Sequence, residues 1–169
     1  MINLEELERR ARLYATRHGR TILEARLGTG TDGTVWQTTV PSAIKVSERE
    51  RSHSNERDSY LRLREHGVKT VCGCKVPQLI KFDDELMIVE MDIIKPPCIL
   101  DFGKAYIDQR PPYDADQLAE YAQEQAELWG DDIKAVRAIQ AKLRSYGIHY
   151  LDAKPANIIL RPGPIRLTT

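Results

Sequence analysis

Two short segments of the chain combine residues that could handle a phosphate ester. The first, Gly28-Thr29-Gly30-Thr31-Asp32-Gly33, sets three glycines at the spacing G-x-G-x-x-G. A backbone without side chains can approach phosphate oxygens closely, and its N–H groups can then face the anion. The second, Asp152-Ala153-Lys154-Pro155-Ala156-Asn157, holds a carboxylate, an ammonium and an amide. The carboxylate could accept a hydroxyl proton, and the amide oxygen could help to hold magnesium.

The glycine run alone is a weak signal, because several folds share it. A dinucleotide-binding fold would have a helix directly after the glycines. Here residues 35–40 read as a strand, and Val35 lies two positions after Gly33. This arrangement resembles the glycine-rich loop of protein kinases, G-x-G-x-x-G-x-V. The alternative is a glycine-rich β-turn that binds nothing. The ATP-binding residues that the resemblance implies are Gly28, Gly30, Gly33 and Val35.

A lysine follows on the next predicted strand. Ala43-Ile44-Lys45 resembles the kinase V-A-I-K signature, with Ser42 in place of the first valine. By this resemblance Lys45 neutralises the α- and β-phosphates, and a carboxylate on the next helix holds it in position. Glu56 is the best partner, although Glu56 taken alone fits a solvated helix charge equally well. The other candidate carboxylates are Glu48, Glu50 and Glu65.

The run Ile88-Val89-Glu90-Met91-Asp92 resembles the kinase segment that receives adenine. The resemblance implies main-chain contacts to adenine from Glu90 and Asp92, with Val89 at the gatekeeper position. A plain buried strand explains the same side chains.

The segment 150–157 resembles the kinase catalytic loop, H-R-D-x-x-x-x-N, with Tyr150 and Leu151 in place of the histidine and the arginine. A turn after a helix is the alternative. The resemblance implies that Asp152 receives the hydroxyl proton, Lys154 neutralises the γ-phosphate and Asn157 binds Mg²⁺. Because these motifs occur in kinase order, the chain is similar to the protein-kinase-like superfamily over roughly residues 20–169. The implied cofactors are ATP and Mg²⁺.

One kinase motif is missing from its usual position. The D-F-G that carries a magnesium-binding aspartate normally follows the catalytic loop. On this alignment that aspartate falls at about Thr169, the last residue. With Asn157 as the only matched ligand, we expect weak metal binding. Asp101-Phe102-Gly103 lies just after the adenine segment, and we interpret this string as a coincidence in a linker. The alternative is that Asp101 contributes to metal or substrate binding.

Hydrophobic spacing and turn signals predict the elements that position these residues. With the resemblance, they indicate an α+β protein-kinase-like fold. We expect a five-stranded antiparallel N-lobe with one helix over residues 21–93, an N-terminal helical extension over 1–20, and a reduced, mainly helical C-lobe over 94–169. The predicted helices are 3–17, 55–66, 113–129 and 131–146, and the predicted strands are 22–27, 35–40, 43–46, 77–82, 86–94, 157–160 and 165–167.

The amino-acid composition limits the classes of binding partner. The 169 residues include 25 Lys and Arg and 25 Asp and Glu, and this zero net charge argues against nucleic-acid binding. No apolar run could cross a bilayer and no signal-peptide core is present, so we expect a cytoplasmic protein without membrane contact. A reduced C-lobe would expose apolar surface, which favours self-association. The cysteines, which we expect to be reduced thiols, are Cys72, Cys74 and Cys98.

Two functions fit a nucleotide site of this kind. The first is a phosphotransferase that moves phosphate from ATP to a hydroxyl of a protein or a small molecule. The second is a catalytically impaired pseudokinase that serves as a nucleotide- or partner-binding module, which the missing D-F-G aspartate favours. A glycine-rich structural protein without nucleotide is a third hypothesis.

Overall fold

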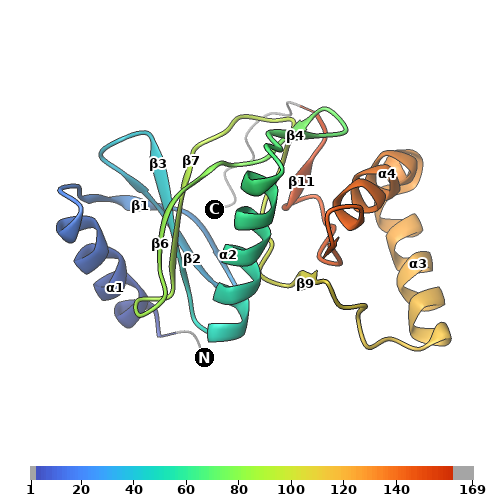
Figure 1. Ribbon diagram of the computed structural model, residues 1–169, viewed down its shortest axis with the longest axis horizontal. Helices are drawn as coiled ribbons and strands as arrows, with labels where there is room; N and C mark the ends of the chain where they lie inside the picture. The colour runs from blue at the N-terminus through green and yellow to red at the C-terminus, as the bar shows by residue number, and fades with distance from the viewer. Residues whose placement is uncertain (1–2, 162–169) are drawn as a thin grey trace.

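Five antiparallel strands form the sheet that carries the glycine run (Figure 1). The computed structural model describes residues 3–161. Within the sheet the strand order is β1-β2-β3-β7-β6, and every neighbouring pair is antiparallel. The bounds of these strands are β1 (Ile22–Gly30), β2 (Gly33–Thr38), β3 (Ser42–Ser47), β6 (Leu79–Asp83) and β7 (Ile88–Asp92).

The central strand β3 is buried along its whole length. Successive side chains of a strand point to opposite faces of the sheet. Ile44 and Val46 therefore pack in one apolar cluster, whereas Ala43 belongs to a second cluster on the opposite face. Lys45 shares the face of Ala43, so β3 carries an ammonium group into the side of the sheet that the second cluster occupies.

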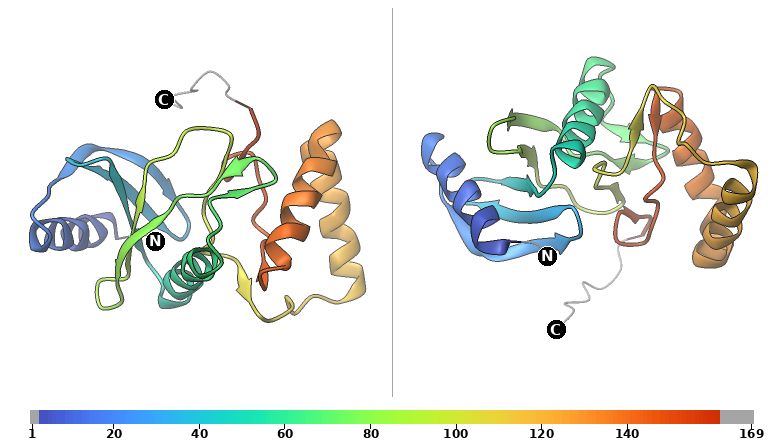
Figure 2. Two further views of the ribbon diagram at one scale, coloured as in Figure 1. Left: turned by 45° about the horizontal axis from the view of Figure 1, so that its top comes forward. Right: turned by 90° about the horizontal axis from the view of Figure 1, so that it is seen from below.

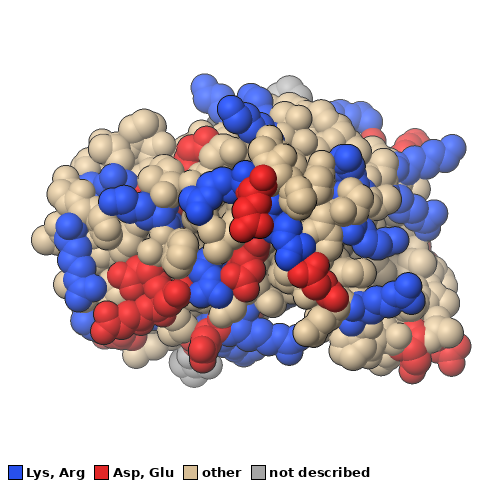
Figure 3. Space-filling view, viewed as in Figure 1, with Lys and Arg blue, Asp and Glu red and all other residues tan. Residues whose placement is uncertain are grey.

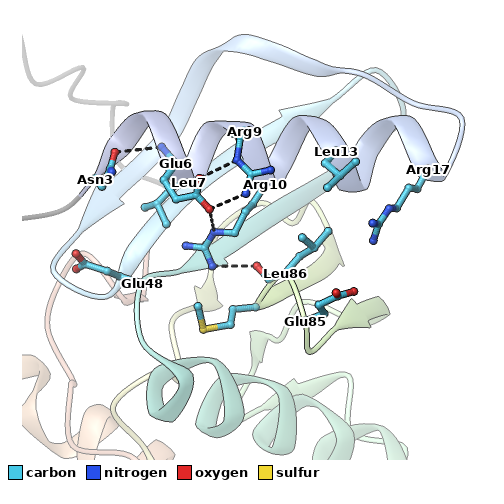
Figure 4. Close-up of a pocket in the computed structure, with 11 residues that line it drawn as sticks. Asn3, Glu6, Leu7, Arg9, Arg10, Leu13, Arg17, Glu48, Glu85 and Leu86 are labelled. Carbon is cyan, nitrogen blue, oxygen red and sulfur yellow. Dashed lines mark hydrogen bonds and ion pairs between the residues drawn. The ribbon is translucent and has the colours of Figure 1, made fainter.

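Helix α1 (Leu4–Arg17) covers the face of the sheet that Ile44 occupies. The buried guanidinium of Arg10 donates hydrogen bonds to the carbonyl oxygens of Ser47 and Leu86, each at 3.1 Å. Figure 4 shows the contact with Leu86 and the residues around a hollow of about 590 Å³ beside Arg10. Arg10 thus attaches α1 to β3 and to the turn before β7. The apolar residues that α1 buries are Leu7, Ala11, Tyr14 and Ala15.

Three further helices lie on the other side of the sheet. Helix α2 (Glu50–Glu65) packs its Tyr60 and Leu63 into the second cluster. Helices α3 (Ala115–Trp129) and α4 (Ile133–Arg144) form a pair at the end of the molecule opposite α1 (Figures 1 and 2). Helix α4 buries three apolar residues, whereas no residue of α3 is buried. The short 3₁₀ helix η1 (Gly130–Asp132) joins them.

Short strands bring together segments that are far apart in the sequence. One small sheet has the order β11-β8-β5-β4, and β8 pairs antiparallel with β11. This pairing sets the residues just after β8 beside the loop that precedes β11. A second pair is β9 with β10, in which Tyr106 lies opposite His149 and Ile107 lies opposite Ile148. The bounds are β4 (Thr70–Val71), β5 (Cys74–Lys75), β8 (Cys98–Ile99), β9 (Tyr106–Ile107), β10 (Ile148–His149) and β11 (Ile158–Ile159).

The structure agrees with the expected α+β class and with the antiparallel sheet. The four predicted helices are present, although α2 begins at Glu50 rather than at residue 55. The sequence pattern did not predict β4, β5, β8, β9 or β10, because two-residue strands carry too little alternation to be recognised. The predicted strand 165–167 lies outside the described residues.

Surface charge is mixed in sign. Figure 3 shows Lys and Arg side chains interspersed with Asp and Glu side chains on one face of the molecule. None of the helices within residues 3–161 is long and apolar enough to span a membrane. Cys72 is exposed, Cys74 and Cys98 are buried, and all three are free thiols. In this part of the chain, no group of three or more His, Cys, Asp or Glu side chains could hold a metal ion.

Candidate functional site

A cavity of about 540 Å³ lies between the glycine run and the loop that precedes β11. The end of β1 contributes residues 27–30, and the end of β7 with the two residues after it contributes residues 92–94. Lys45, Asp101 and Asn157 also line it. The cavity therefore contains side chains from both segments that the sequence pattern singled out. Its apolar lining includes Leu27, Val35, Ala43, Met91, Ile93 and Ile94.

The ammonium of Lys45 sits between two carboxylates in this cavity. It donates a hydrogen bond to Oε2 of Glu56 at 2.8 Å and another to Oδ1 of Asp101 at 2.8 Å. Glu56 is only 1% exposed, and its Oε1 is buried without a hydrogen-bond partner among the described residues. The Lys45–Glu56 pair is the one that the sequence favoured over the other glutamates. Asp101 is an additional partner.

One cation shared by two carboxylates sets the protonation of all three groups. Burial disfavours the charge on Lys45, but Glu56 and Asp101 outweigh it and raise the pKa of the ammonium. Burial raises the pKa of Glu56 to about 7, because Lys45 offsets only part of this effect and the charge of Asp101 adds to it. Burial acts in the same direction on Asp101, yet Lys45 lowers its pKa overall. Asp101 therefore holds the negative charge more firmly than Glu56 does.

Asp101-Phe102-Gly103 is not a plain linker, because Asp101 lines the cavity and accepts a hydrogen bond from Lys45. Asp101 lies two residues after the end of β8, and the backbone N–H of the intervening Leu100 donates to the carbonyl oxygen of Asn157 at 2.7 Å. Asp101 has a φ of 61°, a left-handed conformation that is uncommon outside glycine and that often marks a functional position. The pairing of β8 with β11 places Asp101 beside the loop that precedes β11, at the cavity.

Phe102, the residue after Asp101, anchors this segment in the core. Its side chain is fully buried, and its ring packs edge-on against Tyr60 of α2, with the centroids 5.2 Å apart. On another side it packs against Tyr150 at 5.2 Å. The hydroxyl of Tyr150 donates to the carbonyl oxygen of Leu100 at 2.6 Å. Tyr150, which stands where kinases have histidine, thus ties the loop that precedes β11 to the segment that carries Asp101.

The loop before β11 is held by its own side chains. The side-chain nitrogen of Asn157 donates to Oδ2 of Asp152 at 2.9 Å and to the Asp152 carbonyl oxygen at 3.0 Å. The ammonium of Lys154 lies 3.1 Å from Oδ2 of Asp152. The amide nitrogen of Asn157, a residue that lines the cavity, is therefore engaged by Asp152.

The three glycines of the first motif are present for different structural reasons. A Cβ added at Gly33, where φ is 153°, would lie 2.1 Å from the carbonyl oxygen of Val46, so the close approach of β2 to β3 requires glycine. A Cβ at Gly28 or Gly30 would meet nothing within 4 Å. These two glycines leave open space beside the cavity, whereas Gly33 serves the sheet itself.

Glu90 does not lie in the cavity. Its strand β7 is paired on both sides, with β3 and β6, so the sheet uses the backbone groups of its middle residues. The Glu90 side chain is fully buried on the α1 side and accepts hydrogen bonds from Tyr14 at 3.0 Å, from Ser42 at 2.6 Å and from Arg20. Asp92, two residues later, does line the cavity. Its backbone N–H donates to the carbonyl oxygen of Gln78 at 3.1 Å.

Most of the site residues predicted from the sequence line the cavity, whereas Asp152 and Glu90 do not, and Asp101 was missed. The signal was present in the literal D-F-G string. Kinase order puts this motif after the catalytic loop, whereas here the string precedes Asp152 in the sequence.

Comparisons with known proteins do not assign a family. No protein-family model matches the chain, and no curated protein matches it. Among solved structures, a chain of the ternary complex of streptomycin, ATP and APH(2")-IIa matches with a TM-score of 0.41 and 19% sequence identity. The match covers 83% of this chain and 41% of that chain, so this chain spans about two-fifths of the length of the structure that it matches. Because this similarity is so distant, the chemistry of the site must be argued from the geometry of the site alone.

Proposed function

We propose that the chain binds ATP in the 540 Å³ cavity and transfers the γ-phosphoryl group to a hydroxyl. The observation that carries this proposal is the ammonium of Lys45, held by Glu56 and Asp101 beside the open glycine strand. A buried cation fixed in this way is suited to neutralise phosphate oxygens. A lysine whose only purpose was to stabilise the fold would not need a cavity of this size in front of it.

The rest of the cavity fits the other parts of a nucleotide. The backbone at Gly28 and Gly30 has no side chains to keep phosphate oxygens away. The apolar side chains of Val35, Ala43 and Met91 offer a slot for the adenine ring. In this proposal the main chain of residues 92–94 provides the polar contacts to adenine, and Glu90 instead anchors α1.

The oxygen atoms of two side chains fit a magnesium ion. Asp101 uses Oδ1 to accept from Lys45 and from the N–H of Gly103, at 2.8 and 3.2 Å, which leaves Oδ2. Asn157 uses its nitrogen for Asp152, which leaves its amide oxygen. Carboxylate and amide oxygens are ligands that Mg²⁺ accepts together with water and phosphate oxygens. We infer that Asp101 and Asn157 would hold Mg²⁺, which would neutralise charge on the phosphates.

Asp152 has the chemistry required at the acceptor. A hydroxyl oxygen bonds to the γ-phosphorus while the bond from that phosphorus to the β,γ-bridging oxygen breaks, and ADP leaves. The proton of the hydroxyl passes to the carboxylate of Asp152. Lys154, 3.1 Å from that carboxylate, is positioned to neutralise the γ-phosphoryl group as it moves.

The experiment measures binding and turnover separately. Calorimetric titration with ATP, with and without Mg²⁺, should give binding that Mg²⁺ strengthens in the wild type and not in Asp101→Asn. Turnover of radiolabelled ATP should fall strongly in Asp152→Asn while ATP affinity is kept. Absence of ATP binding would overturn the proposal. ATP binding with the same background turnover in wild type and Asp152→Asn would instead establish a pseudokinase.

A further inference from the structure

Asp152 also lines a second hollow, of about 360 Å³. Asp32, at the turn of the glycine hairpin, lines both this hollow and the 540 Å³ cavity. Asn157 and Lys154, which line the cavity, contact the Asp152 carboxylate at 2.9 and 3.1 Å. A compound in the hollow would therefore meet Asp152 next to the proposed phosphate site. The volume suits a small molecule rather than a folded partner.

The two aspartates of the hollow are already compensated. Lys104 lies 3.5 Å from Oδ2 of Asp32 and 3.8 Å from Oδ2 of Asp152. Lys154 lies near Asp152 as well, and the hydroxyl of Ser52 donates to Oδ1 of Asp32 at 3.2 Å. Two lysines thus balance two carboxylates, so the aspartates do not make the hollow attractive to a cationic compound.

Two arginines that line the hollow give it positive charge. Arg49 and Arg51 line it, are exposed, and form no ion pair with the acidic side chains of residues 3–161. The guanidinium of Arg51 lies 5.2 Å from the ring centroid of Tyr106, which also lines the hollow. A guanidinium presents a planar fork of N–H donors that matches a carboxylate or a phosphate group.

The start of α2 adds to this field. Arg49 is the N-cap residue, and no side chain caps the helix there. The first N–H groups of an uncapped helix carry partial positive charge and attract anions. This contribution is secondary, because the two guanidinium groups of Arg49 and Arg51 already select for negative charge.

We propose that the 360 Å³ hollow receives the phosphoryl acceptor, and that the acceptor is a small hydroxyl compound carrying a carboxylate or a phosphate group. Arg49 and Arg51 pair with its anionic group, and its hydroxyl is turned to the carboxylate of Asp152. This assignment rests on the proposed phosphotransferase function. It excludes polycationic acceptors, since their charge would be repelled by the arginines.

A matched set of three-carbon compounds with neighbouring hydroxyl groups tests this assignment. Glycerol is neutral, glycerate carries a carboxylate, glycerol phosphate carries a phosphate, and aminopropanediol carries an ammonium. Backbone NMR shifts near Tyr106 and Arg51 report binding of each compound in the presence of a non-hydrolysable ATP analogue. Glycerate and glycerol phosphate should shift these signals, and the stronger of the two identifies the preferred anion. Glycerol and aminopropanediol should bind much more weakly.

Charge variants provide the control. Substitution of Arg49→Gln together with Arg51→Gln should reduce the affinity for the anionic diols by about tenfold or more, the effect of losing one charge-assisted hydrogen bond. Arg64→Gln, near the other end of α2 and outside the hollow, makes the same kind of charge change and should have no effect.

The outcomes distinguish failure of the anionic acceptor from failure of the phosphotransferase function. ATP binding together with equal shifts from glycerol or aminopropanediol would overturn the anionic acceptor and leave the phosphotransferase standing. Binding of the anionic compounds that survives the double arginine substitution would also overturn the anionic acceptor. Phosphoryl transfer to a peptide only would overturn it as well. Absence of ATP binding would overturn both.

Discussion

The ammonium of Lys45 donates a 2.8 Å hydrogen bond to Oδ1 of Asp101, a residue 56 positions further along the sequence. This contact joins the central sheet to the segment after β8. Because β8 also pairs with β11, the same segment is tied to the loop that carries Asp152 and Asn157. The two halves of the proposed nucleotide site are therefore held together by Asp101, and the first two predictions concern this ion-pair cluster.

Replacement of Lys45 by methionine should destabilise the protein strongly. The substitution leaves Glu56 buried and Asp101 partly buried without their cation, and breaking a buried pair such as Lys45–Glu56 costs about 3–5 kcal/mol. Urea denaturation measures the free energy of unfolding. Lys104→Met is the control, since Lys104 is 43% exposed and its ion pairs are longer, so we expect a loss within about 1 kcal/mol. Similar losses in the two variants would contradict this account.

Glu56 should titrate near neutral pH. Folding raises its pKa from 4.5 to about 7. Its protonation therefore stabilises the fold fully below about pH 4.5, and this contribution is lost as the pH rises through about 7. Carbon NMR of the carboxyl group gives the midpoint directly. Asp101→Asn should lower that midpoint, because the charge of Asp101 is one of the causes that raise it.

A stability profile checks the same titration independently. The free energy of unfolding of Glu56→Gln should vary less than that of the wild type as the pH rises from below 4.5 to above 7. Parallel profiles in the two proteins would mean that Glu56 does not change its protonation in this window.

Truncation of Phe102 should affect stability and nucleotide binding together. Phe102 is fully buried between Tyr60 and Tyr150, so Phe102→Ala should cost about 3–5 kcal/mol in the free energy of unfolding. Because the ring supports Asp101, ATP affinity measured by calorimetry should fall as well. Phe102→Leu keeps most of the apolar volume and should lose less of both. An alanine variant with full ATP affinity would show that Asp101 does not depend on this support.

The glycines of the hairpin should separate stability from binding. Gly33→Ala drives a Cβ against the carbonyl oxygen of Val46, so we expect a loss of about 2 kcal/mol or more in the free energy of unfolding. Gly30→Ala has open space for its Cβ, so its stability should stay within about 0.5 kcal/mol of the wild type. If ATP phosphates approach this strand, Gly30→Ala should weaken ATP binding. Loss of stability in Gly30→Ala with unchanged ATP binding would contradict the proposed role of Gly30.

Local patterns in the sequence were sufficient for much of this structure. Alternation and turn residues identified the five main strands, because each is long enough for its period to be read. Helical spacing identified the helices in the same way. The Lys45–Glu56 pair was within reach of sequence reasoning, since the two residues lie on consecutive elements.

The side of β7 on which Glu90 lies was harder to predict. Sequence similarity aligned Glu90 with a ligand-facing strand end, but the strand is paired on both edges and its side chains alternate. Val89 and Met91 pack toward α2, so Glu90 faces α1 and meets Tyr14. Strand parity of this kind depends on the register with β3.

The sequence by itself determined the glycine hairpin and the loop with Asp152 and Asn157, because these depend on neighbouring residues. The antiparallel sheet was predicted from the resemblance, since its pairing of β3 with β7 joins segments that lie far apart in the chain. Only the tertiary structure decided that Asp101 belongs to the site. Its position follows from a two-residue strand pair, β8 with β11, which has no periodic signature and which closes a long loop. The energy that holds it comes from the burial of Phe102 and the charge of Lys45, and both are contacts between segments that the sequence keeps apart.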